Sequence, residues 1–101
     1  MIVAVGIVEL HIEGAQSLKE KRMVVKSLRD KLRHRFEVAA NEVAMQELHQ
    51  RARIGVAFIA SGNAAADAML EKISRFIETN AEARVNGWMS EKLDFDENVA
   101  L

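Results

Sequence analysis

The sequence predicts a small α+β domain whose elements follow the order strand, helix, strand, strand, helix, strand. Three observations support this. Residues 17–36 read as an amphipathic helix behind a capping signal, residues 63–79 read as a second one, and four strand-like apolar runs lie around them. This order is the split-βαβ, or ferredoxin-like, βαββαβ arrangement. Right-handed crossovers then place both helices on one face of a four-stranded antiparallel sheet.

The first strand is expected at residues 2–12, where β-branched and apolar residues come early and alternation follows. One of its faces is wholly apolar and suits the helices. The other face begins with Val3, Val5 and Ile7 and ends with Glu9 and His11. Because it is unfavourable to expose an apolar face of this kind to water, we expect a homodimer to cover it.

The helix at 17–36 should begin at Ser17. Ser17 and Glu20 form a capping box, in which the hydroxyl accepts from the amide of Glu20 and the carboxylate reaches back to the amide of Ser17. At about 100° per residue, one stripe is apolar and must be buried. Its members are Leu18, Val25, Leu28 and Leu32, with Val24 at the edge.

A second stripe of this helix is basic. Residues 19–35 hold eight basic side chains against two acids, whereas the rest of the chain holds six against thirteen. The basic stripe lies roughly 120° from the apolar one and consists of Lys19, Arg22, Lys26, Arg29 and Arg33. Such a surface could bind RNA phosphates. A second candidate is an anion site at the helix N-terminus, formed with Ser17, Lys19, Lys21 and Arg22. The capping carboxylate of Glu20 competes with an anion for this second site. The alternative is a solvated face balanced by the acidic remainder.

The later elements follow from similar patterns. We expect strands at residues 36–43, 53–60 and 84–95, a short helical turn at 45–51, and a helix at 63–79. The buried stripe of that helix is Ala66, Leu70, Ile73 and Ile77. The domain is expected to span residues 1–93, with an acidic C-terminal tail at 94–101 that could fold onto the basic stripe.

Composition narrows the function. The 101 residues suffice for one core, and without cysteine there is no disulfide and no thiolate zinc site. No glycine-rich phosphate loop or catalytic motif is present, so we expect a non-enzymatic, cytoplasmic protein without cofactor, metal or membrane segment. A weaker alternative is a metal or acid–base site built from Glu9, His11, Glu42 and His49.

Several segments resemble the YlxP-like family of small bacterial proteins of unknown function. The resemblance is carried by residues 7–22, whose S-L-K-x-K-R segment is its most specific part, by residues 28–36, by Glu42-Val43, and by Gln50-Arg51-Ala52 leading into residues 55–57. It covers about nine-tenths of the chain and implies a ferredoxin-like fold. Family genes often stand beside those of translation initiation factor two and ribosome-binding factor A, which implies a ribosome- or RNA-associated role.

The resemblance also selects residues. Its matched positions are Ser17, Leu18, Lys19, Lys21, Arg22, Glu42, Gln50 and Arg51. Glu42, Gln50 and Arg51 are therefore expected to contact a partner, although the chain departs from the family pattern at Ala44 and His49. The first hypothesis is an RNA- or ribosome-binding protein that uses the basic helix. The second is a dimeric protein-interaction or small-ligand module that works through the open sheet face.

Overall fold

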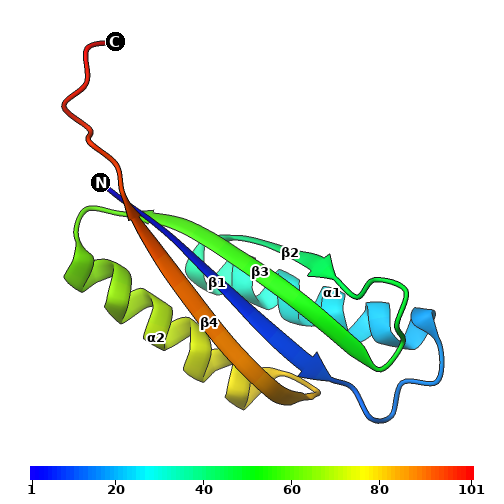
Figure 1. Cartoon of the computed structure of the whole chain (residues 1–101). Helices are drawn as coiled ribbons and strands as arrows, with labels where there is room; N and C mark the ends of the chain where they lie inside the picture. Colours follow the sequence, from blue (N-terminus) through cyan, green and yellow to red (C-terminus); the bar gives the residue numbers. More distant parts are fainter.

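The computed structural model describes residues 1–101 and confirms the βαββαβ order (Figure 1). The strands pair antiparallel in the order β2-β3-β1-β4, and the two helices lie on one face of this sheet. The elements are β1 (Ile2–His11), α1 (Leu18–Phe36), β2 (Ala39–Ala44), β3 (Arg51–Ala60), α2 (Asn63–Asn80) and β4 (Arg84–Asp94).

Alternation along β1 separates the two faces of the sheet as predicted. Ile2, Ala4, Val8 and Leu10 are buried on the side of the helices. The apolar stripe of α1 meets them there, with Val25, Leu28 and Leu32 at 4% exposure or less. The predicted stripe of α2 is buried too, from Ala66 to Ile77. Burying each large aliphatic side chain contributes about 1.5–3 kcal/mol, so these stripes hold the helices on the sheet.

Trp88 and Gly6 show how closely the helix side of the sheet is packed. A Cβ atom on Gly6 would lie 2.4 Å from the indole of Trp88. The indole therefore occupies the space that a side chain at position 6 would need. Trp88 also packs against the small core cluster that contains Ala66 and Leu70, so this ring belongs to the side under α2.

Two predictions of local structure between α1 and β3 were wrong. The predicted strand at 36–43 is β2 at 39–44, because α1 continues through Phe36 and ends at Glu37, whose φ of 54° is left-handed. The predicted helical turn at 45–51 is a turn with one i→i+3 hydrogen bond, from Leu48 N–H to the Met45 carbonyl at 3.0 Å. Met45 has a φ of 64°, which is incompatible with a right-handed helix.

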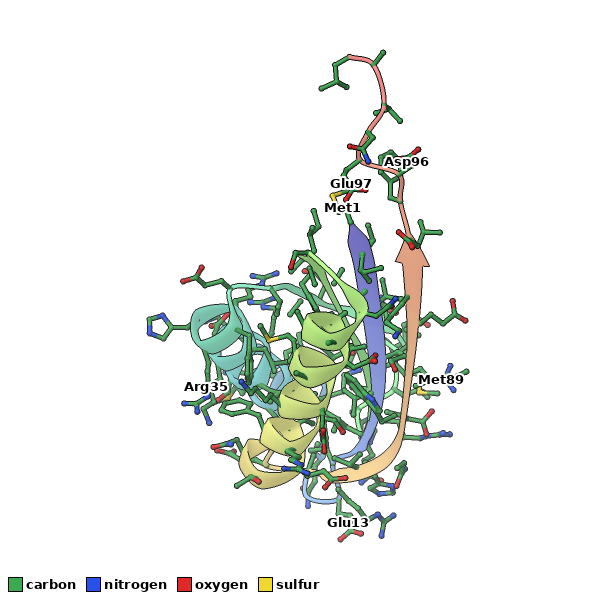
Figure 2. All side chains as sticks on the ribbon, turned by 90° about the vertical axis from the view of Figure 1, so that its left-hand side faces the viewer. Met1, Glu13, Arg35, Met89, Asp96 and Glu97 are labelled. Atoms are coloured by element: carbon green, nitrogen blue, oxygen red, sulfur yellow. The ribbon has the colours of Figure 1, made fainter.

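The N-terminus and the last residue of β4 lie together at one end of the sheet (Figures 1 and 2). Phe95 N–H donates to the Met1 carbonyl at 2.8 Å, and the Met1 ammonium lies 3.1 Å from a Glu97 carboxylate oxygen. The backbone N–H of Glu97 and then the ammonium group lower the pKa of this carboxyl. Beyond β4 the tail points away from the body of the domain, and the structure does not bring it onto α1.

Candidate functional site

The N-terminus of α1 is capped by side chains of the chain itself. Glu20 N–H donates to the Ser17 hydroxyl at 3.1 Å, as the capping box predicts. The Glu20 carboxylate accepts from the backbone N–H of Gln16 at 2.6 Å, one residue earlier than the predicted bond to Ser17. A negative charge therefore already lies where an anion would bind, which disfavours the candidate anion site at this helix end.

Lys21, predicted to contribute to that anion site, lies in the interior with 0% of its surface exposed. Its ammonium donates to the carbonyls of Met45, Gln46 and Arg51 at 2.8, 3.2 and 3.3 Å. It also lies 2.9 Å from Glu42 Oε2, an ionic contact in which that oxygen accepts no hydrogen bond. The side chain fastens the turn between β2 and β3 to α1 and is not available to a ligand.

Five other basic side chains share one stripe of α1, and the last of them, Arg33, contacts β2. We call Lys19, Arg22, Lys26, Arg29 and Arg33 the basic surface. Lys19 and Arg22 are exposed and make no ion pair. They are the members with the fewest competing contacts, and they stand at the start of the helix.

The other three members are already partly engaged. Lys26 lies 2.9 Å and Arg29 lies 3.4 Å from oxygens of Asp30. The hydrogen bond from Lys26, followed by the charges of Lys26 and Arg29, lowers the pKa of Asp30. Arg33 donates to the Ala40 carbonyl at 2.9 Å and to the Asn41 side chain at 2.8 Å. Arg33 therefore links α1 to β2 as well as adding charge.

The predicted partner-binding residues do not form one surface. Glu42 is 16% exposed and pairs with Lys21. The amide of Gln50 donates to the Ala15 carbonyl at 3.2 Å, while its backbone carbonyl accepts from Ile12. The side chain of Arg51 points to the opposite face of the sheet, toward Glu9. Glu42 and Gln50 therefore hold the loops around the start of α1.

Glu9 is held between two arginines on the side of the sheet away from the helices. Arg51 and Arg53 donate to its two oxygens at 2.7 and 2.9 Å. The hydrogen bond from Arg51 and then that from Arg53 lower the pKa of Glu9. Glu42 lies on the other face of the sheet, so the alternative acid–base site is not assembled, and no group of three or more His, Cys, Asp or Glu side chains could hold a metal ion.

The same side of the sheet carries a broad apolar surface that we call the open face. It contains Val3, Val5 and Ile7 of β1 with neighbours from the other three strands, and Val5 is 43% exposed. A hollow of about 490 Å³ lies at its centre, lined by Ala39, Val43, Gly55, Ala57 and Met89 among others. The alternation in β1 predicted the apolar face, but not the hollow. The signal for the hollow was the small residues Ala39, Gly55 and Ala57.

The chain is thus a small ferredoxin-like protein with a basic helix and an open sheet face. It belongs to the family described as "Protein of unknown function (DUF503)", which its residues 3–88 match. It is 32% identical over 74 residues to the uncharacterized protein YlxP of Bacillus subtilis strain 168, covering 73% of this chain and 80% of that protein. The predicted YlxP-like resemblance is confirmed.

Solved structures support the fold. A protein designated YJCS superimposes with a TM-score of 0.57 at 11% identity, covering 91% of this chain and 99% of that one. A putative antibiotic biosynthesis monooxygenase from Deinococcus radiodurans gives a TM-score of 0.52 at 12% identity over 100% and 98% of the two chains. At these identities the likeness extends to the fold alone. Neither α1 nor α2 combines the length and the apolar composition that a membrane-spanning helix needs.

Proposed function

We propose that this protein is a non-enzymatic RNA- or ribosome-binding protein that contacts phosphates through the basic surface of α1. The observation that carries this proposal is the exposure of Lys19 and Arg22 without ion-pair partners, beside Lys26, Arg29 and Arg33 on the same side of the helix. The rest of the chain is acidic, so the positive potential is concentrated on one side and would orient the protein toward a polyanion.

The ion pairs of Glu9 and Glu42, the two carboxylates considered for acid–base catalysis, favour binding over catalysis. Glu9 is engaged by two arginines, and Glu42 pairs with the buried Lys21. Hydrogen bonds from Arg51 and Arg53 lower the pKa of Glu9, so this carboxylate is a weak proton acceptor at neutral pH.

The test is a titration with ribosomal subunits, with a structured RNA and with a single-stranded RNA over a range of salt concentrations. If about four phosphates are contacted, a fourfold rise in salt weakens binding to single-stranded RNA by about 50-fold, following a slope of about 0.7 per contact. The variant Lys19→Glu/Arg22→Glu should bind much more weakly and reduce the slope by about 1.4.

A matched control carries the same change of net charge at another place. Lys72→Glu/Lys92→Glu alters two exposed side chains away from the basic surface, Lys72 on α2 and Lys92 on β4, of which Lys92 lies 2.7 Å from Asp67. It should retain most of the affinity. Binding that ignores salt, or that both double variants lower equally, would contradict the role of α1 specifically.

A further inference from the structure

The open face is too apolar for a sheet surface that stays in water. Among its large side chains, Ile59, Met89 and Leu93 are 67%, 64% and 61% exposed. In Figure 2, Met89 lies on the side of β4 away from the helices, whereas Arg35 lies in the helix layer. Soluble monomers seldom expose a continuous apolar patch of more than a few hundred Å², so this face calls for an occupant.

The strand register distributes large and small residues in a definite way. Along one row across the sheet lie Asn41 of β2, Gly55 of β3, Ile7 of β1 and Met89 of β4. The next row holds Ala39, Ala57, Val5 and Glu91 in the same strand order. In both rows β2 and β3 supply the smaller side chains, while β1 and β4 supply the larger ones. The hollow is lined from all four strands, and its smallest residues on this face, Ala39, Gly55 and Ala57, come from β2 and β3.

This distribution complements itself. Consider a two-fold axis that lies above the open face, parallel to the strands and midway between β3 and β1. This axis places β1 of one copy over β3 of the other, and β4 over β2. Ile7 then faces Gly55 of the second copy and Val5 faces Ala57, so large side chains enter the hollow in both directions. Sheets packed in this way keep their strands within about 30° of each other.

The charges agree with the same axis. Glu9 lies directly opposite Arg53 across the β1–β3 pair, so the two-fold brings Glu9 of each copy over Arg53 of the other. The facing charges in this row are opposite, which favours the stacking, whereas Glu91 in the row of Val5 faces the uncharged Ala39 of the second copy. At about 3.3 Å per residue and about 4.8 Å between strands, strands of 10, 6, 10 and 11 residues cover about 600 Å² per copy. Two copies bury about 1,200 Å², the lower end for specific interfaces.

We infer that the open face binds a second copy of this chain, and that the two sheets stack about this two-fold axis. The helices then form the outer layers, so both basic surfaces stay accessible. The inference does not depend on RNA binding, and an RNA-binding result neither supports nor opposes it.

The first experiment measures mass in solution by sedimentation equilibrium. The wild-type chain should have twice the mass of one copy at micromolar concentration. Met89→Asp should raise the dissociation constant by at least about 30-fold, the size of a strong interface contact. Met23→Asp is the control, because Met23 of α1 is 66% exposed and outside the face, and it should leave the dimer intact.

The second experiment tests the axis. Glu9→Arg and Arg53→Glu should each weaken self-association, because each places like charges opposite one another in the stacked sheets. An equimolar mixture of the two variants should form a heterodimer, since all four facing charges are then opposite. Far-UV circular dichroism establishes that both variants are folded.

A wild-type chain that stays monomeric would overturn the inference and assign the face to another partner, such as a small apolar ligand or a foreign protein. A dimer that Met89→Asp leaves unchanged would place self-association on another surface. Folded charge variants that fail to pair on mixing would refute this two-fold arrangement.

Discussion

Replacing the buried Lys21 by methionine is the most decisive perturbation of the fold. The substitution keeps most of the aliphatic volume and removes the ammonium. Three carbonyls then lose a donor, and the Glu42 carboxylate, 16% exposed, loses its counter-ion. Breaking a buried ion pair by removing one partner costs about 3–5 kcal/mol. A domain of this size has about 5–15 kcal/mol of stability in total, so the loss is a large share.

The assay is urea and thermal unfolding followed by circular dichroism. The free energy of unfolding should fall by about 3–5 kcal/mol, and the melting temperature by roughly 12–40 °C. Lys21→Met/Glu42→Gln should recover part of this loss, because no carboxylate is then left without its counter-ion. Lys19→Met is the control, since Lys19 is exposed and should change stability by at most about 0.5 kcal/mol.

The reasoning fails if Lys21→Met costs less than about 1 kcal/mol, the value of one ordinary hydrogen bond. It also fails if the double variant is no more stable than the single one. Either result would mean that the ammonium does not hold the turn at residues 45–51 against α1.

Three further predictions concern single positions. Hydrogen bonds from Arg51 and Arg53 lower the pKa of Glu9 below its ordinary value of 4.5. The ionised Glu9 therefore stabilises the fold above pH 4.5, and this stabilisation is lost as the pH falls through the lowered pKa. Urea unfolding at several pH values should show that the stability difference between wild type and Glu9→Gln becomes smaller in acid. Gly6→Ala should cost about 1–3 kcal/mol because its Cβ meets Trp88 at 2.4 Å, whereas Gly14→Ala meets nothing within 4 Å and serves as the control in thermal melts. Ser17→Ala removes the cap of α1 and should cost about 1 kcal/mol in the same melts.

Much of the fold could be predicted because local signals agreed with the tertiary packing. The capping box located the start of α1, and the spacing of Val25, Leu28 and Leu32 identified its buried side. The same spacing explains why the prediction that Lys21 contributes to an anion site was wrong. Positions 21, 25, 28 and 32 follow one helical stripe, so the sequence pattern itself placed this lysine among buried residues, and only its charge suggested the surface.

Other features depended on pairing between distant segments. The pairing register decides which side chains share a face: Glu42 of β2 lies opposite Ile54 of β3, whereas Glu9 of β1 lies opposite Arg53. Extra residues also interrupt the register at Val43 of β2 and Asn86 of β4. A shift of one residue moves a side chain to the opposite face, and no local pattern announces it. For this reason the sequence could not place Glu42 relative to Glu9. Nor could it predict that three backbone carbonyls accept hydrogen bonds from Lys21.

The position of Trp88 has a practical consequence for spectroscopy. It is the only tryptophan in the chain, and its indole packs against Gly6 and the residues under α2. Its fluorescence should therefore report when α2 separates from the sheet during unfolding.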